Sequence, residues 1–343
     1  MSLMFAVPQS QAEPKNPIIN DSHFHLTNYV QKGPTPREFL KTMGDKVGKS
    51  ALMGLPLQQK WDFFVSGNRV PDYYLESDAR LYYYSFVDAA LAKQYLALTP
   101  EEQNRFDPMI TGFNPTDMYA TDHIERVLRT FPGVFTGIGE FSIHKEFVSS
   151  KIAGHTASVN NRAFHEILKQ ASEIGLLVVL HCDINTIRND DKLNPAHYLD
   201  VVNVLRKHPK ANIIWAHTGL GRYVKPTTNH TELLLNILND PALSHVYFDL
   251  AWDEIAKYIQ ATPETTRKWA AVINAHPERF LAGTDSVAPR TQEKYFKNYT
   301  VHQPLIDLLS NKASRMVRLE NYDTLFGDAR RKVRDWETRH VAR

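Results

Sequence analysis

The sequence lacks several features that would place it in specialised classes of protein. Its 343 residues include a single cysteine, Cys182, so an intrachain disulfide is excluded. The longest apolar run, residues 174–180, is about a third of the roughly 20 residues needed to cross a bilayer, and no membrane-spanning helix is expected. A chain of this length can bury a large core without disulfides or a structural metal.

An excess of charge of one sign is also missing. Lysine and arginine number 40 against 38 aspartate and glutamate, which gives a formal net charge of +2. A dedicated nucleic-acid binder would show a clear basic excess or stripe, so this class is disfavoured. Residues 328–343 are locally basic, which would suit contact with nucleic acid. Acidic residues are interleaved with the basic ones, however, and Val333 and Trp336 form an apolar stripe, so we expect a surface helix.

Two common motifs are absent as well. The Gly-x-Gly texts at 137–139 and 219–221 lack the third glycine of a dinucleotide-binding fingerprint, and no Gly-x-Ser-x-Gly elbow is present. A dinucleotide cofactor is therefore not expected. Cys182 is expected to be a small buried apolar side chain and not a nucleophile.

Residues 1–16 are expected to be an N-terminal extension, with residues 1–3 left by cloning and residues 4–13 resembling the stub of a trimmed export signal. A cytoplasmic location is slightly favoured, and a periplasmic or secreted one follows if that stub is genuine. Residues 17–343 are expected to form a single domain.

Short apolar runs alternate with segments of helical period, which predicts an α/β fold and specifically a (β/α)8 TIM barrel. Helices are expected over 161–174 and 194–207. Long connections after strands two and three, 56–80 and 91–119, are candidate lids, substrate walls or the cover of a second small cluster. The expected strands are 18–25, 51–55, 81–87, 134–141, 176–182, 211–217, 245–250 and 280–285.

Potential metal ligands lie at the carboxyl ends of these strands. In the first strand, alternation places Asp21, His23 and His25 on one face. Four later strands each end with one further donor, namely Glu140, His181, His217 and Asp285. Burying so many imidazoles and carboxylates at one rim is unfavourable unless a cation offsets it. Nitrogen and oxygen donors of this kind suit Zn²⁺, and also Mn²⁺, Fe²⁺ or Co²⁺.

From residue 18 to the C-terminus, this pattern resembles the amidohydrolase superfamily of metal-dependent barrels. Three sequence motifs are most similar to its "amidohydrolase 2" branch, namely His217-Thr218-Gly219, Gly283-Thr284-Asp285 and residues 321–326 (NYDTLF). That branch contains lactone hydrolases and nonoxidative decarboxylases.

The resemblance implies a role for each residue that matches. His23 and His25 would bind the more buried ion, His181 would complete the imidazole set, and Asp285 would bind the ion and accept a proton from the attacking water. His217 would polarise the substrate or move a proton in a one-metal site, and would bind a second ion in a two-metal site.

Glu140 follows Gly137-Ile-Gly139, a text that is similar to the metal-dependent deoxyribonuclease branch, in which the glutamate is a ligand. The alternative is a carboxylate that orients His181 or His217. Arg222 and Arg188, which follow strands six and five, are the best candidates to bind a substrate carboxylate. Asp249 is expected to be structural or to support a ligand, and His144 to be exposed.

The leading hypothesis is a metal-dependent hydrolase of a small cyclic ester or amide, with a carboxylated lactone favoured. The alternatives are a nonoxidative decarboxylase of an aromatic or unsaturated acid and a metal-dependent phosphodiesterase or deoxyribonuclease. The expected partner is a small-molecule substrate. Nucleic acid and membrane are not favoured, and a homodimer is an open alternative.

Overall fold

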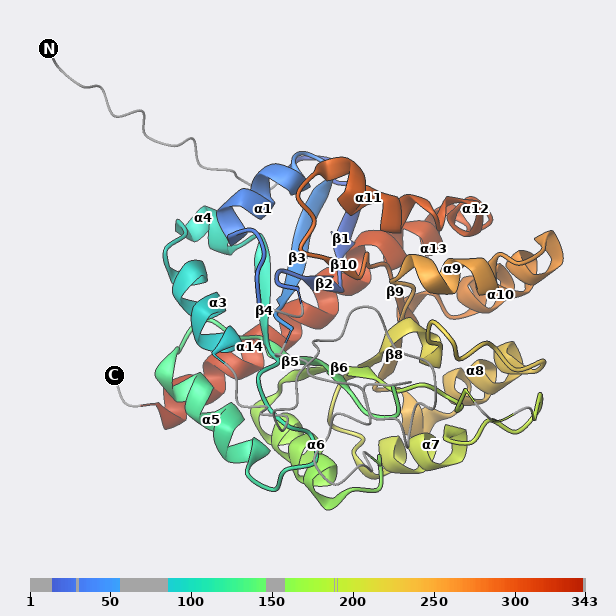
Figure 1. Cartoon of the computed structure of the whole chain (residues 1–343), viewed down its shortest axis with the longest axis horizontal. Helices are drawn as coiled ribbons and strands as arrows, with labels where there is room; N and C mark the ends of the chain where they lie inside the picture. Colours follow the sequence, from blue (N-terminus) through green and yellow to red (C-terminus); the bar gives the residue numbers. More distant parts are fainter. Residues whose placement is uncertain are drawn as a thin grey trace, which may run out of the picture.

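The computed structural model describes residues 14–28, 31–55, 86–145, 158–187, 189 and 191–341. Several sequence-based predictions lie outside these residues, namely those for residues 1–13, the aromatic connection 56–80, Arg188, and residues 81–85 of the expected third strand. In the described part, strands alternate with helices and surround a common centre (Figure 1).

The strands form one parallel sheet that closes on itself. The order is β10-β2-β3-β4-β5-β6-β7-β8-β9, with β1 paired to β3. The backbone N–H of Asp285 donates to the His23 carbonyl at 2.7 Å, and that of Ala288 to the His25 carbonyl at 2.9 Å, so the last strand lies against the first. The strands are β1 (Ile19–Asp21), β2 (Phe24–His25), β3 (Val47–Met53), β4 (Phe106–Ile110), β5 (Gly137–Ser142), β6 (Leu177–His181), β7 (Ile213–Trp215), β8 (Val246–Asp249), β9 (Phe280–Leu281) and β10 (Ser286–Val287).

This closed parallel sheet confirms the predicted barrel. Strands such as β6, whose sequence LVVLH is buried throughout, have helices on one face and the barrel interior on the other. They therefore read as continuous apolar runs. The first and last barrel strands are each interrupted, between β1 and β2 and between β9 and β10. These two interruptions carry His23 and Asp285.

The prediction for the third strand was wrong. The strand between β3 and β5 is β4, Phe106–Ile110, which lies inside the region expected to be a long connection. Val87, the end of the expected strand 81–87, is the first residue of a helix. Asp107 and Pro108 disfavour strands on propensity, but here burial between β3 and β5 outweighs that preference.

Helices cover the outside of the barrel, and local sequence sets their ends. Thr35 caps α1 through a reciprocal capping box with Glu38, and Asn161 caps α6, which ends at Gly175 with φ 87°. The α-helices are α1 (Pro36–Met43), α3 (Val87–Leu96), α4 (Pro100–Gln103), α5 (Ala120–Thr130), α6 (Arg162–Ile174), α7 (Tyr198–Lys207), α8 (His230–Leu238), α9 (Asp253–Ile259), α10 (Pro263–Ala275), α11 (Gln292–Thr300), α12 (Gln303–Ile306), α13 (Asn311–Arg315) and α14 (Asn321–His340). Shorter turns are η2 (Ala216–Gly219), η3 (Pro241–Leu243), η4 (Pro277–Arg279) and η5 (Met316–Glu320).

We call the barrel end at the carboxyl ends of the strands the mouth. The C-terminal helix α14 closes the opposite end and crosses behind the strands in Figure 1. Its residues Tyr322, Leu325 and Phe326 pack against interior side chains of the strands, including Met109 and Val179. Val333 and Trp336 are also buried, in agreement with the apolar stripe expected for this segment. Among the described residues, no helix is both long and apolar enough to span a bilayer.

Candidate metal centre

Five polar side chains meet inside the barrel at the carboxyl ends of its strands. Two overlapping triads, His23–Glu140–His217 and His23–His25–Asp285, each have their nitrogen and oxygen donors within 4.8 Å of one another. The three histidines and Glu140 are at most 4 % exposed. At this depth water does not solvate the donors, so each requires a partner from within the site.

The distances place several donors around one point. His25 Nε2 is 3.1 Å from Asp285 Oδ1 and 3.4 Å from Glu140 Oε2. His23 Nε2 lies 3.6 Å from Asp285 Oδ1 and 3.3 Å from His25 Nε2. Two ring nitrogens this close can satisfy each other only if one is protonated, whereas a cation between them would accept both lone pairs.

His217 Nε2 is the most informative atom of the cluster. It is buried and, within the described residues, has no hydrogen-bond partner. Glu140 Oε1 and Asp285 Oδ2 are each 3.7 Å away from it. A buried polar atom without a partner costs about 1–3 kcal/mol, and a cation shared with the two carboxylates would remove that cost.

Three of the histidines are fixed through their other ring nitrogen. His23 Nδ1 contacts Asp249 Oδ2 at 2.9 Å, and His217 Nδ1 faces the Ala251 carbonyl at 3.1 Å. His181 Nε2 contacts Asp183 Oδ1 at 3.0 Å. Metal-binding histidines are held in this way by an oxygen on the nitrogen that faces away from the metal.

His181 lies beside Glu140 and outside the two triads. Its Nδ1 is 2.6 Å from Glu140 Oε1, the same oxygen that His217 Nε2 approaches. Lys145 Nζ lies 3.3 Å from that oxygen. Sequence reasoning missed Lys145, because a single lysine five residues after Glu140 forms no recognisable pattern. Asp183 is buried against His181.

A glycine brings Glu140 to the site. A Cβ atom at Gly139 would lie 2.2 Å from the Val179 carbonyl oxygen, so only glycine allows β5 to approach β6 this closely. The Gly-x-Gly text is therefore explained by strand packing and not by phosphate binding. Glu140 follows directly and is buried among the histidines.

Left-handed backbone is concentrated near the cluster. His217, Thr218 and Asp285 have φ values of 55°, 55° and 47°, and Trp252 has 83°. Residues other than glycine adopt such values at a cost of about 1–3 kcal/mol, and they persist where packing enforces them. Here the unfavourable conformation directs two of the donor side chains, those of His217 and Asp285, into the barrel.

The carboxylates shift the pKa of the histidines beside them. Burial opposes protonation of His25, but Asp285 and Glu140 outweigh it and raise its pKa to about 9. Burial also opposes protonation of His217, but Asp249 is the largest opposing influence and the pKa rises to about 10. Without a metal the cluster is thus neutralised by protons, and a bound dication would displace them because ligating imidazoles are neutral.

Asp21 does not share the site, which corrects the expectation from strand alternation. Its carboxylate accepts hydrogen bonds from Thr284 Oγ1 and the Tyr295 hydroxyl, both at 2.7 Å. The chain is interrupted between β1 and β2, so the alternation of side chains does not run from Asp21 to His23. Burial raises the pKa of Asp21 to about 6 although these hydrogen bonds oppose the rise.

Trp252 forms one wall of the mouth. Its ring centroid is 5.0 Å from that of His217 and 6.1 Å from that of His181. Lys145 Nζ and Arg222 Cζ each lie 5.7 Å from the centroid of the indole. The structure therefore places Arg222, predicted to bind substrate, at the wall of the site, where its Nε also pairs with Glu254 Oε1 at 3.2 Å.

Two other predicted side chains lie away from the donors. Cys182 is fully buried, as expected, and burial raises the pKa of its thiol well above the usual value. His144 is half-buried and not exposed, because its ring stacks on His197 with centroids 3.8 Å apart. The prediction of an exposed His144 was therefore wrong.

The residues fit a divalent cation. They supply imidazole nitrogens and carboxylate oxygens, the donor types of zinc sites in proteins. Three histidines are held by oxygens from behind, and the buried His217 Nε2 points between two carboxylates. Asp249 completes this arrangement, since it contacts His23 and also accepts the backbone N–H of His217 at 2.8 Å.

The sequence matches no protein-family model and no curated relative. Solved structures are similar. An amidohydrolase from Burkholderia multivorans with bound zinc has a TM-score of 0.55 at 13% identity, covering 90% of this chain and 99% of its own. A candidate 2-pyrone-4,6-dicarboxylic acid hydrolase from Pseudomonas putida has 0.53 at 14%, covering 90% and 97%. A dihydroorotase from Campylobacter jejuni has 0.50 at 13%, covering 94% and 86%. At these identities the likeness establishes the fold, so the resemblance found in the sequence is confirmed at that level: the chain has the TIM-barrel fold of the amidohydrolases.

Proposed function

We propose that this chain is a metal-dependent hydrolase of a small cyclic ester or amide, with a carboxylated lactone as the favoured substrate. The observation that carries the proposal is the convergence of donors at the barrel mouth, above all the buried His217 Nε2, which lacks a hydrogen-bond partner among the described residues and lies 3.7 Å from each of two carboxylates. The fold shared with a zinc-containing amidohydrolase supports it.

The donors fall into two sets, which would serve one ion or two. His23, His25 and Asp285 form the first set. Glu140 Oε1, with His181 Nδ1 at 2.6 Å and His217 Nε2 at 3.7 Å, forms the second. With one ion, His181 would position Glu140. With two, it would be a ligand. Zinc is the favoured metal, and manganese, iron or cobalt suit the same donors.

Such a cation lowers the pKa of water from 15.7 toward about 7 and polarises a carbonyl oxygen. The chain's own residues would complete the reaction. Asp285, the carboxylate of the first set, has a side chain that is 11% exposed, and it would accept the proton of the attacking water. His217 would orient the carbonyl or move a proton. Trp252 would exclude solvent from that side.

The cations at Trp252 support a carboxylated substrate. Arg222 and Lys145 both lie over the indole ring, so an unsaturated ring stacked on Trp252 would have its carboxylate within reach of positive charge. Arg188 is proposed for the same role from the sequence alone.

A panel of lactones, cyclic amides and aryl carboxylates, incubated with metal-loaded protein, tests the proposal. Acid release without CO₂ is expected, and it should be abolished in Asp285→Asn and unchanged in His340→Ala, which alters an exposed histidine on α14. CO₂ release would instead establish a decarboxylase. Cleavage of single-stranded DNA that is lost in His181→Ala would establish a nuclease.

A further inference from the structure

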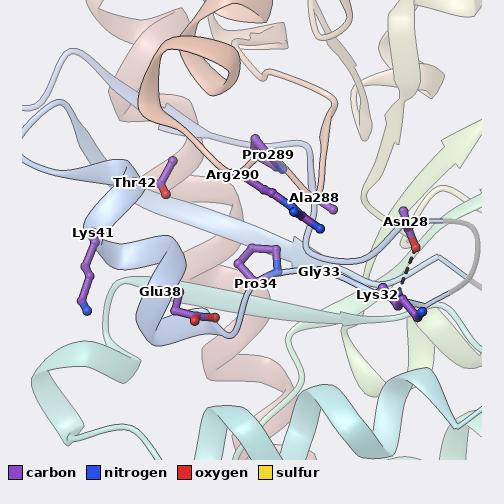
Figure 2. Close-up of a pocket in the computed structure, with 10 residues that line it drawn as sticks. All are labelled: Asn28, Lys32, Gly33, Pro34, Glu38, Lys41, Thr42, Ala288, Pro289 and Arg290. Atoms are coloured by element: carbon purple, nitrogen blue, oxygen red, sulfur yellow. Dashed lines mark hydrogen bonds between the residues drawn. The ribbon is translucent and has the colours of Figure 1, made fainter.

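A groove of about 610 Å³ lies at the rim of the barrel mouth, outside the cluster of metal donors (Figure 2). Its walls are formed by Asn28 and residues 32–34 after β2, by helix α1, and by residues 288–290 after β10. A volume of this size accommodates a drug-sized ligand. The metal-centre residues do not line it, and the function proposed above does not use it.

The groove lies close to the metal centre along the chain. Val287 pairs with His25, and the Ala288 N–H donates to the His25 carbonyl at 2.9 Å. Ala288 lines the groove and follows Asp285 by three residues, so their Cα atoms are at most roughly 11 Å apart. A ligand that carries an extended arm could span a separation of this size.

The groove is positively charged. Lys32, Lys41 and Arg290 line it, and in the described part of the chain none of them has a carboxylate within salt-bridge distance. The one acid of the lining, Glu38, accepts hydrogen bonds from the N–H of Thr35 at 2.8 Å and its hydroxyl at 3.0 Å. Glu38 keeps its negative charge while it caps α1, and this charge acts on Lys41, so the three cations and one acid leave the lining with a net charge of +2.

The three cations are oriented differently. In Figure 2 the side chain of Arg290 extends along the groove between Ala288 and Pro34, in the direction of Asn28 and Lys32. Lys41 points away from the groove in the same view. The guanidinium of Arg290 is therefore the principal group that a ligand would meet, and its planar fork matches the two oxygens of a carboxylate or phosphate.

We propose that this groove binds the anionic arm of an elongated substrate, through Arg290 and Lys32, while the reacting carbonyl lies at the metal centre. The placement of the carbonyl rests on the function proposed above, whereas binding of the oxyanion does not. The substrate class is thus a cyclic ester or amide that carries a carboxylate or phosphate on an extended arm.

Isothermal titration of the metal-loaded full chain with succinate, and separately with inorganic phosphate, tests the proposal. We expect Arg290→Gln to weaken binding about tenfold and Lys32→Gln about threefold, because charge-assisted hydrogen bonds are lost. Lys41→Gln is the matched control, since it removes the same charge from the same groove and should change affinity less than about twofold. Whichever probe binds more tightly identifies the oxyanion.

Two results of the binding measurements alone would overturn the proposal. One is equal loss of affinity in Arg290→Gln and Lys41→Gln, which would mean that only net charge matters. The other is binding that Arg290→Gln leaves unchanged and a chelator abolishes, which would place the anion on the metal.

If no lactone or amide is hydrolysed but succinate binding still depends on Arg290, the proposed function fails and the groove stands. If hydrolysis occurs and Arg290→Gln alters neither affinity nor KM for anionic substrates, the groove alone fails.

Discussion

The two ends of the barrel both bury carboxylates, but they neutralise them by different means. At the closed end, the Asp107 carboxylate accepts hydrogen bonds from Nε and Nη2 of Arg330 at 2.7–2.9 Å, from the Tyr322 hydroxyl at 2.9 Å and from the Thr136 hydroxyl at 2.9 Å. At the mouth, Glu140 and Asp285 face mainly imidazoles.

The difference in partners separates a carboxylate buried for stability, Asp107, from carboxylates buried for function, Glu140 and Asp285. The closed end is complete, because the chain supplies a permanent cation and enough donors for every oxygen of Asp107. The mouth is incomplete, since His217 Nε2 has no hydrogen-bond partner among the described residues and two ring nitrogens face each other at 3.3 Å. A bound dication, as proposed above, would account for the second arrangement and is unnecessary for the first.

The largest effect is expected from removing a carboxylate at the mouth. Asp285→Asn should lower kcat by roughly 10²–10⁴-fold, the usual contribution of a positioned general base. The same change at the closed end, Asp107→Asn, should lower stability and leave kcat of the folded protein intact. Steady-state kinetics and urea unfolding measure the two. Loss of stability without loss of activity in Asp285→Asn would contradict the comparison.

At the closed end, Arg330→Met should destabilise the protein by roughly 2–4 kcal/mol, because Asp107 would keep a buried charge without its main partner. The value lies at the lower side of the range for buried pairs since the Arg330 side chain is 34% exposed. Arg331→Met, on the same helix and exposed, should cost less than about 0.5 kcal/mol. Equal midpoints of urea unfolding in the two variants would remove the contrast.

A metal ion should raise the free energy of unfolding by binding at the mouth, and this gain should not depend on the Asp107–Arg330 pair at the closed end. At a free zinc concentration of 100 times Kd, the native state gains about 2.7 kcal/mol. Arg330→Met should retain this gain in thermal unfolding, and His23→Asn should lose it. A metal-induced rise in Tm that survives in His23→Asn would show that the ion binds elsewhere.

The smallest expected effect is a pH dependence of stability that comes from His230, a buried histidine whose ring makes no contact with a carboxylate among the described residues. Burial lowers the pKa of His230 to about 4, whereas His217 is raised to about 10. Since His230 stays neutral in the fold and the unfolded state takes up a proton near pH 6.5, stability falls as pH drops from 6.5 toward 4. The loss should reach about 2 kcal/mol at pH 5. Urea unfolding of His230→Gln should show a shallower pH dependence over this range, and an unchanged slope would argue against a neutral His230.

The sequence predicted most of the barrel because buried parallel strands are continuous apolar runs, which remain visible in a single chain. It failed at β4, where Asp107 and Pro108 look unlike a strand. Asp107 is present because Arg330, 223 residues later, pairs with it. No local pattern carries information about a partner at that distance.

The donor residues were likewise predicted from their places at strand ends, and the structure brings His23, His25, Glu140, His217 and Asp285 together. Asp21 was misplaced because alternation applies only within an uninterrupted strand. The arrangement of Glu140, His181 and Lys145 around one oxygen depends on rotamers and on the approach of β5 to β6, and neither is readable from spacing.

The most direct test of the account is a crystal of the protein grown with zinc and measured at wavelengths on both sides of the zinc absorption edge. We expect an anomalous peak at the barrel mouth, about 2.0–2.2 Å from His23 Nε2 and from an oxygen of Asp285. A second peak beside Glu140, His181 and His217 would establish the two-ion form. A well-ordered mouth without anomalous density, in crystals that bind zinc elsewhere or not at all, would contradict the central claim.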